Sequence, residues 1–417
     1  MPGAPRRVAV PSPMMPPQRS SHRTIARGAA ILCACVAVSC SSGDDVVSVP
    51  TDATETTASP TTPDVATLEP VSTTSQVERI ADGPLVEVCP ATIVVQTDEL
   101  PDVAVAPLIV LAGPDPVVTP TAVSGPLTRP DGTVEDVFID VRSGGPAVGF
   151  SSAIDVMADD PSITLAIDDG AAIVDDGDPA AWRVVASLTA RSRNAIVIDP
   201  ATYPDVTTVG DLAATDIEVR HFTAAPVIDY LVDAGALDAS QLVGGFDGEP
   251  AAFVAADGAV AQQGDLLRDP VLFASLPQWA APVQALAADD AGWADRDDLV
   301  ITPASDADAL ADCLGRLIPI IQSAIVAYAA EPSATNATVA AARLAANPLS
   351  RLDVALLDQM TAAALENGVL SNGDDSTVGD IEADRLSAFW SDSLGLAPEI
   401  AASIVIDRFS DPDIGLP

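Results

Sequence analysis

The chain has 417 residues, enough for two domains of ordinary size, and its 48% hydrophobic content can fill a large core. Its formal net charge at pH 7 is −41, and all 19 of its basic residues are Arg. A chain this acidic repels nucleic acid and anionic lipid head groups, so we exclude a nucleic-acid-binding function. The acidic surface is expected to serve solubility more than recognition.

The first 39 residues are predicted to be a signal peptide. They contain no acidic residue, and Arg19, Arg23 and Arg27 precede the apolar run 28–39 (GAAILCACVAVS), which is too short to span a bilayer. The run ends in Ala37, Val38 and Ser39 before Cys40, which resembles a bacterial lipoprotein signal. The resemblance implies cleavage before Cys40 and a diacylglycerol on its sulfur, which would anchor the protein to the cell membrane. The alternative is an ordinary cleaved signal, with Cys40 incidental.

Residues 40–75 are predicted to be a disordered tether. They are rich in Thr, Ser, Pro, Asp and Val without periodicity, and such a segment cannot bury enough apolar area to offset its ordering entropy. The tether would hold the folded part away from the membrane.

Two cysteines follow the tether, Cys89 and Cys313. In an exported protein an even pair predicts a disulfide, and two buried free thiols are the alternative. The sequence has no CxxC motif or Cys/His cluster, and His221 is the only His after the signal. We therefore expect no metal site, no His-based catalytic triad and no cofactor.

From residue 92 onward, short strands and helices alternate. Strands are predicted at 92–96, 137–141, 162–167, 182–188, 194–198, 217–222, 241–246 and 259–263. Helices are predicted at 147–158, 223–235, 249–256, 309–330, 334–346, 352–367 and 381–394. This pattern favours an α/β protein with two lobes and a mostly helical C-terminal region. Lobe one is expected to comprise 76–190 and 285–417, and lobe two 191–284.

The stretch 137–170 reads as strand, Gly-rich turn, helix, strand and acidic turn. Pro146 suits a first helical position, which would leave the backbone amides of Ser143, Gly144 and Gly145 near a helix N-terminus. Ligands of open α/β sheets bind beyond the carboxyl ends of strands. We therefore expect the Gly-rich turn and the acidic turn at 168–170 on one rim. The alternative is an ordinary βαβ unit with two tight turns.

Several short motifs resemble the type II periplasmic binding proteins of ABC importers, in the nitrate/sulfonate/taurine and NMT1/THI5-like group. They are Thr97-Asp98 with Pro101, Arg142-Ser143-Gly144-Gly145, Asp199-Pro200 with Tyr203-Pro204-Asp205 and Asp211-Leu212, Tyr230-Leu231 with Gly235, Gln263-Gly264 before Asp269-Pro270, and Asn372-Gly373 with Gly379-Asp380. Their order extends over some 300 residues. The resemblance implies two lobes that close on a ligand like a hinge.

The resemblance also implies a ligand site at strand ends of both lobes. The candidates are Thr97, Asp98, Ser143, Gly144, Gly145, Asp168 and Asp169 from lobe one, and His221, Thr223, Asp247, Gln263, Gly264 and Asp265 from lobe two. The aromatic residues typical of the thiamine-precursor branch are missing. The carboxylates among the candidates could bind a cationic solute, or they are solvated loop acids in a chain rich in Asp.

The function expected from this resemblance is capture of a small polar solute and its delivery to an ABC permease and its ATPase. The protein is expected to be a monomer. An enzyme on the same fold is disfavoured because such relatives need His-rich sites and this chain offers one candidate His. A cell-surface interaction protein that has lost solute binding is the third alternative.

Overall fold

The computed structural model describes residues 83–223 and 225–417. The predicted signal peptide (1–39), the predicted acylation site Cys40 and the predicted tether (40–75) lie outside the described residues.

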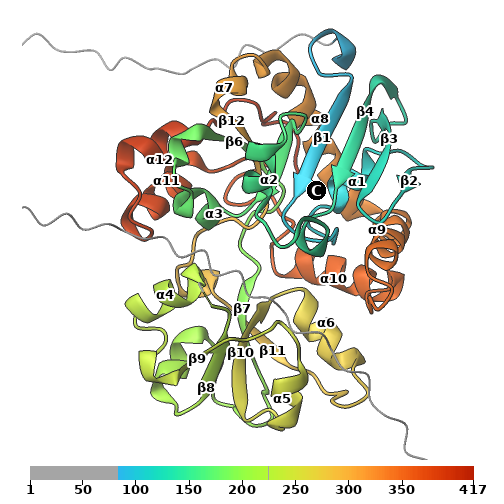
Figure 1. Ribbon diagram of the computed structural model, residues 1–417. Helices are drawn as coiled ribbons and strands as arrows, with labels where there is room; N and C mark the ends of the chain where they lie inside the picture. The colour runs from blue at the N-terminus through green and yellow to red at the C-terminus, as the bar shows by residue number, and fades with distance from the viewer. Residues whose placement is uncertain (1–82, 224) are drawn as a thin grey trace, which may run out of the picture. The chain divides into compact units, whose positions relative to one another are not determined.

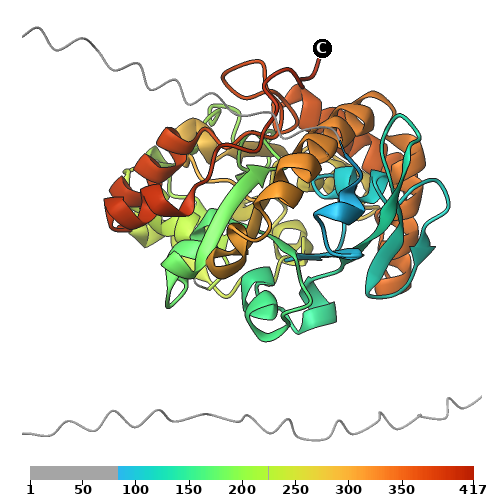
Figure 2. The ribbon, with the colours of Figure 1, turned by 90° about the horizontal axis from the view of Figure 1, so that it is seen from above.

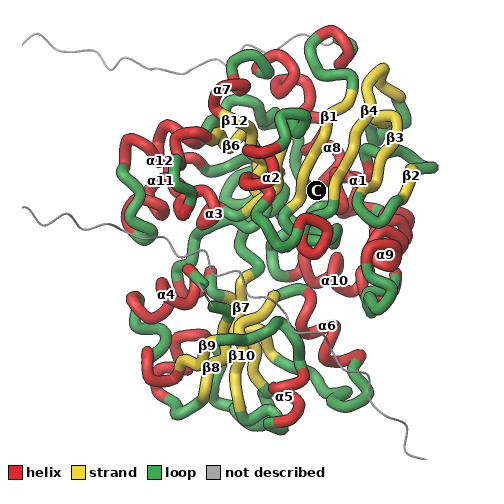
Figure 3. The backbone as a smooth tube through the Cα atoms, viewed as in Figure 1, coloured by secondary structure: helices red, strands yellow, loops and turns green. Residues whose placement is uncertain are grey.

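Seven strands form a first, mixed sheet in the order β2-β3-β4-β1-β5-β12-β6 (Figure 3). Strand β1 is buried along almost its whole length and is parallel to both β4 and β5. The carboxyl ends of these three strands therefore meet at one edge. The bounds are β1 Thr92–Thr97, β2 Val117–Val118, β3 Ala122–Thr128, β4 Val134–Arg142, β5 Leu165–Asp168, β6 Trp182–Ser187 and β12 Leu299–Pro303.

Five strands form a second sheet in the order β11-β7-β10-β8-β9. Their bounds are β7 Asn194–Ile198, β8 Glu218–His221, β9 Leu242–Gly244, β10 Val260–Asp265 and β11 Gln284–Ala287. The predicted return at residue 285 falls inside β11, which pairs with β7 along its whole length. The chain therefore leaves the second sheet only after Ala287.

Helices surround both groups of strands (Figure 1). With the first sheet we group α1 Ala106–Val110, α2 Ala153–Asp159, α3 Gly170–Asp175, α7 Ala304–Ala307, α8 Ala311–Ala330, α9 Ser333–Ala346, α10 Val354–Glu366, α11 Ala383–Asp392 and α12 Pro398–Ile404. With the second sheet we group α4 Pro226–Asp233, α5 Ala251–Ala255 and α6 Arg268–Ser275. We call these two groups the first and second lobe. The predicted α/β class with two lobes and a helical C-terminal region is confirmed.

The C-terminal helices cover different parts of the first sheet. Helix α8 packs on α1 and β6, while α12 packs on β6 and α11 on α3. Figure 2 shows α11 and α12, in red, apart from the orange helices α8 to α10. Among the described residues α8 is the one helix long and apolar enough to cross a membrane, but 56% of that stretch is buried inside the fold. Its apolar side chains are therefore core residues of the first lobe.

A disulfide joins Cys89 to Cys313 of α8, with 4.8 Å between the two Cα atoms. Cys89 follows a short 3-10 helix, Leu85–Glu87, that packs against α8 and β4. The bond thus connects the beginning of the first lobe to its longest helix.

The two lobes also contact each other through aromatic rings. Tyr230 of α4 lies against Trp293 and Phe389 of α11, with ring centroids 5.6 Å apart in both pairs. Trp293 and Phe389 contact each other at 5.3 Å. Edge-to-face packing of this kind adds stability beyond the area that the rings bury.

The helix predicted at 147–158 is wrong at its beginning. The Gly-rich turn leads into a 3-10 turn, Gly145–Val148, which Gly149 ends in the left-handed conformation at φ +70°. Helix α2 starts only at Ala153, where the side chain of Ser152 accepts a hydrogen bond from the amide of Asp155. The sequence carries this signal, since Ser152 and Asp155 have the spacing of an N-cap and its third helical residue.

Candidate functional site

The loops that follow β1 and β4 are hydrogen-bonded to each other. The Gly144 amide donates to the carbonyl oxygen of Glu99 at 2.9 Å, and the Gly145 amide donates to that of Asp98 at 2.7 Å. A Cβ atom on Gly144 would lie 2.2 Å from the carbonyl oxygen of Thr97, so only glycine fits there. The motifs Thr97-Asp98 and Ser143-Gly144-Gly145 therefore form one interlocked edge.

This interlocking occupies the backbone amides of the Gly-rich turn. The amide of Ser143 donates to the carbonyl oxygen of Thr121 at 2.9 Å, so all three amides of the turn have partners within the protein. The hydroxyl of Thr97 is also bonded internally, to the carbonyl oxygens of Glu99 and Arg142. The turn offers a ligand none of the backbone donors that its sequence predicted.

The carboxylate of Asp168 lies at the first turn of α2. Its Oδ2 atom accepts from the amide of Ile154 at 3.1 Å, and its Oδ1 atom accepts from the amide of Asp169 at 3.1 Å. Helix N-termini favour negative charge, so Asp168 occupies the place that an anionic ligand would take. The N-terminus of α2 is therefore already occupied by a negative charge of the protein, that of Asp168.

Asp169 caps the next helix, α3, by accepting from the amide of Ala172 at 2.6 Å. Gly170 follows it against Asp295, where a Cβ atom would lie 2.0 Å from Oδ1. Asp295 also accepts from the amide of Ala171 and from the indole of Trp390, both at 2.9 Å. The acidic turn is thus held in place by the buried carboxylate of Asp295.

The edge surrounds a cavity of about 440 Å³. Its lining includes three of the predicted ligand residues with carboxyl side chains, namely Asp98, Asp168 and Asp169, which we call the cavity carboxylates. Gly145, Ser152 and Arg343 also line it. Asp98 forms no side-chain hydrogen bond or salt bridge with any described residue, so this carboxylate is open to a ligand.

The cavity carboxylates are held in a negative environment. Burial raises the pKa of Asp98 well above its ordinary value, and the charges of Glu99, Asp168 and Asp298 raise it further. Burial raises the pKa of Asp168 to about 6, against the backbone amides that it accepts from. The pKa of Asp169 is raised by burial and then by Asp168 and Asp295. A cation in the cavity would relieve this repulsion.

None of the predicted residues of the second lobe lines this cavity among the described residues. The Oε1 atom of Gln263 accepts from the amide of Phe222 at 3.1 Å, and Nδ1 of His221 lies 2.7 Å from the carbonyl oxygen of Phe222. Thr223 and Asp247 are exposed loop residues. These candidates gather at the ends of β8 and β10, apart from the cavity.

Gly264 and Asp265 have internal contacts as well. A Cβ atom on Gly264 would lie 2.2 Å from the carboxylate of Asp269. Asp265 accepts from the amides of Leu267 and Arg268 at 2.8 and 2.7 Å. Its other oxygen forms a salt bridge with Arg193, which places Asp265 at the junction between the lobes.

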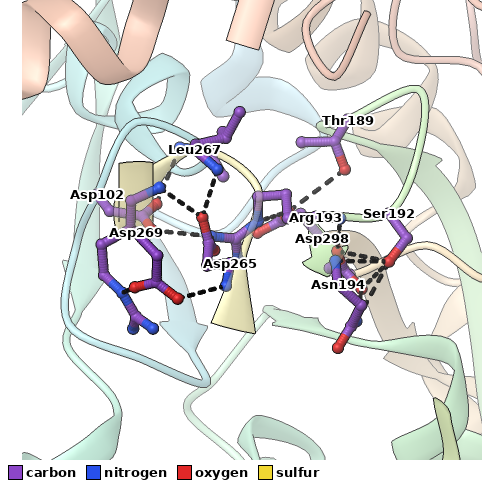
Figure 4. Close-up of polar contacts among 12 residues, drawn as sticks. Asp102, Thr189, Ser192, Arg193, Asn194, Asp265, Leu267, Asp269 and Asp298 are labelled. Carbon is purple, nitrogen blue, oxygen red and sulfur yellow. Dashed lines mark hydrogen bonds and ion pairs between the residues drawn. The ribbon is translucent and has the colours of Figure 1, made fainter. Parts of the chain in front are cut away.

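That junction is an ionic cluster that the sequence analysis did not identify (Figure 4). Arg193 lies just before β7, and its Nη1 atom is 3.0 Å from both Asp102 and Asp265. Its Nε atom is 3.4 Å from Asp298, and its backbone amide donates to Asp297. We call Asp102, Asp265, Asp297 and Asp298 the hinge carboxylates.

The hinge carboxylates connect both crossovers. Asp297 accepts from the hydroxyl of Ser192 at 3.0 Å and from the side-chain amide of Asn194 at 2.9 Å. The neighbouring Arg296 forms a salt bridge with Glu382 at 2.9 Å. The sequence signal was Asp295-Arg296-Asp297-Asp298 directly before β12, a charged run next to a buried strand.

Four carboxylates around one guanidinium leave an excess of negative charge. Burial raises the pKa of Asp298 to about 7, with Arg193 opposing this and Asp102 and Asp297 adding to it. Burial likewise raises the pKa of Asp295 to about 7. Within 83–223 and 225–417, no group of three or more His, Cys, Asp or Glu side chains could hold a metal ion.

A scan against protein-family models found no match, and a search of curated proteins found none either. Solved structures do align with the chain. The alkanesulfonate-binding protein SsuA from Xanthomonas axonopodis pv. citri, bound to MOPS, is 14% identical, with 76% of this chain and 98% of that chain covered and a TM-score of 0.46. The periplasmic nitrate-binding protein NrtA from Synechocystis PCC 6803 is 12% identical, with 76% and 87% covered and a TM-score of 0.48.

A ligand-binding component of an ABC-type import system from Staphylococcus aureus, with zinc bound, is 10% identical. Here 65% of this chain and 83% of that chain are covered, with a TM-score of 0.42. All three are described as binding proteins or ligand-binding components. At these identities and TM-scores the similarity assigns neither a role nor a ligand to this chain.

Proposed function

We propose that the protein is an extracytoplasmic solute-binding lipoprotein that delivers a small polar solute to an ABC importer permease. The lipoprotein-like signal before Cys40 and the tether support a membrane-anchored protein. The two-lobed α/β fold and a cavity at the carboxyl ends of parallel strands support solute capture.

The observation that carries the proposal is the chemistry of that cavity. Among the described residues the side chain of Asp98 has no hydrogen-bond or salt-bridge partner, whereas the helix start and the Gly-rich turn already have theirs. A carboxylate without a partner needs a donor or a positive charge, whereas a nitrate or sulfonate group would meet four acids and only one guanidinium, that of Arg343. We therefore propose a solute that carries an ammonium or guanidinium group.

A thermal-shift and calorimetry screen of the full chain tests this proposal. The probes are putrescine, spermidine and agmatine, compared with taurine, nitrate and pyrimidines. Mass action predicts a higher Tm with a cationic probe. The Asp98→Asn variant should weaken that binding about tenfold or more, because a charged hydrogen bond is lost. The matched variant Asp247→Asn, at an exposed loop position, should bind as the wild type does.

The pH dependence gives a second readout. A cation prefers ionised carboxylates, so protonation of Asp168, whose pKa is raised to about 6, competes with binding. The affinity should therefore fall as the pH is lowered from 7.5 to 5.5. An affinity that rises over this interval would contradict a cationic solute.

The alternative is a cell-surface interaction protein that has lost solute binding. It is favoured by one observation, namely that the lining residues of the cavity come from the first lobe alone among the described residues. No response to any probe, in the wild type and in Asp98→Asn alike, would support this alternative. For the anchor, labelled palmitate should enter the wild type and not a Cys40→Ala variant.

A further inference from the structure

Most of the described arginines form salt bridges with acidic side chains. Nine of the 13 described arginines form a salt bridge with Asp or Glu. Among the other four, Arg183 and Arg343 donate to backbone carbonyls and Arg408 lies over the ring of Phe409. Arg351 is exposed and forms no contact of these kinds. In a chain with a net charge of −41, guanidiniums without a carboxylate are unusual.

Two of these four line the same cavity. It has a volume of about 530 Å³ and lies between the second lobe and the loop that joins α9 to α10. The second lobe contributes Arg268 and Gln278, and the first lobe contributes Arg343, Asn347 and Arg351. Glu249 is the one acidic residue among the described lining residues. The cavity therefore collects positive charge in a molecule dominated by negative charge.

The guanidinium of Arg343 is held in place by the protein and left partly unsatisfied. Its Nη1 atom donates to the carbonyl oxygens of Leu100 and Pro101 at 3.0 and 2.9 Å. Its Nε atom is buried without a hydrogen-bond partner. Burial lowers its pKa, with nearby Arg268 and Arg193 contributing and Asp102 and Glu99 opposing. Nε is enclosed by protein, so Nη2, which forms no hydrogen bond with a described residue, is the donor left for a bound acceptor.

Arg268 faces the same cavity from the second lobe. Its Nε atom is 2.8 Å from Asp269, and its two terminal nitrogens have no hydrogen-bond partner among the described residues. Its side chain is 32% exposed, so these nitrogens remain accessible. Guanidinium groups prefer planar oxyanions, to which they donate two parallel hydrogen bonds.

We propose that this cavity binds a small oxyanion, a phosphate or carboxylate group, between Arg268 of the second lobe and Arg343 and Arg351 of the first. The site shares Arg343 with the acidic cavity, but none of the cavity carboxylates, which would repel an anion, is among its lining residues. An anion that contacts both lobes stabilises the arrangement in which those residues face each other. This inference does not depend on the identity of the transported solute.

The test uses the full chain with inorganic phosphate, and with acetate as a carboxylate probe, at a constant ionic strength set with chloride. We expect phosphate to raise the Tm and to give a measurable Kd by calorimetry. Arg351→Gln and Arg343→Gln should each weaken the binding about tenfold or more, since each removes a charged donor. Arg408→Gln removes the same charge away from the cavity and should leave the Kd unchanged.

Arg351→Gln is the decisive variant, because Arg351 is exposed, forms no salt bridge or side-chain hydrogen bond with a described residue, and is not among the lining residues of the acidic cavity. Arg343 also lines the acidic cavity, so weaker binding in Arg343→Gln is not specific to this site, whereas weaker binding in Arg351→Gln is. The proposal is overturned if phosphate acts no differently from chloride. It is also overturned if Arg351→Gln binds phosphate as the wild type does, or if Arg408→Gln changes the Kd as much as Arg351→Gln does.

Discussion

The cavity carboxylates and the hinge carboxylates are two groups of Asp side chains, and the members of each group are buried or half-buried. At the hinge, Arg193 and the polar groups of Ser192 and Asn194 satisfy the acids from both crossovers. At the cavity, backbone amides satisfy Asp168 and Asp169, while Asp98 contacts none of these donors. The difference shows that whether an acidic residue stabilises the fold or remains available to a ligand depends on its partner. The composition of the sequence does not reveal that partner.

The largest expected effect is at the hinge. Arg193→Met would leave four carboxylates around a neutral side chain, and removing one partner of a buried ion pair costs about 3–5 kcal/mol. Urea unfolding should show this loss of unfolding free energy. Arg220→Met is the matched control, because its pair with Glu218 is well exposed and such surface pairs contribute about 0–1 kcal/mol. Equal losses in the two variants would contradict the structural role of Arg193.

A smaller effect should separate the two groups directly. Asp297→Asn removes an acceptor of several hydrogen bonds at the hinge and should destabilise the fold by about 1–3 kcal/mol. Asp98→Asn should leave the unfolding free energy unchanged or slightly increase it, since it relieves repulsion without breaking a contact. Both are measured by urea unfolding at pH 7.5. A loss in Asp98→Asn as large as that in Asp297→Asn would mean that Asp98 has a structural partner.

The smallest effect concerns pH. Asp295 and Asp298 have folded-state pKa values of about 7, above the ordinary value of 3.8, so the folded protein binds more protons than the unfolded chain between these limits. Stability should therefore rise as the pH falls through this interval, by about 1 kcal/mol from pH 7.5 to 6.5. Thermal unfolding across this range measures the slope, and Asp298→Asn should reduce it. A Tm that falls from pH 7.5 to 6.5 would contradict the raised pKa values.

The parts of the fold predicted from sequence are those set by local patterns. The strands at 92–96 and 194–198 and the C-terminal helices follow from runs of apolar residues at strand and helix spacing. Strand β12 was missed, although Leu299–Pro303 is apolar, because the acids before it resemble a solvated loop. Those acids are buried only through contacts with residues about 100 positions away. No local pattern encodes such contacts.

The candidate site was predicted only in part, because local patterns place residues at strand ends but do not give their long-range contacts. The sequence placed Asp98, Gly145, Asp168 and Asp169 at one edge, and the structure brings these four to one cavity. It could not show that the amides of the Gly-rich turn are satisfied by the loop after β1, since that pairing joins residues far apart in sequence. Arg343 was missed because its helix, α9, has no motif that marks it as part of the site.

The disulfide between Cys89 and Cys313 has a consequence for the order of synthesis. The two cysteines are 224 residues apart, and the complete second lobe lies between them. When Cys89 is made, its partner and α8 do not yet exist, nor does β12, which lies between β5 and β6 in the first sheet. The second lobe starts later in the sequence, but its last strand, β11, is synthesised before β12, the last strand of the first lobe. Domains fold as units during synthesis. The first lobe starts before the second but is the last to be completed.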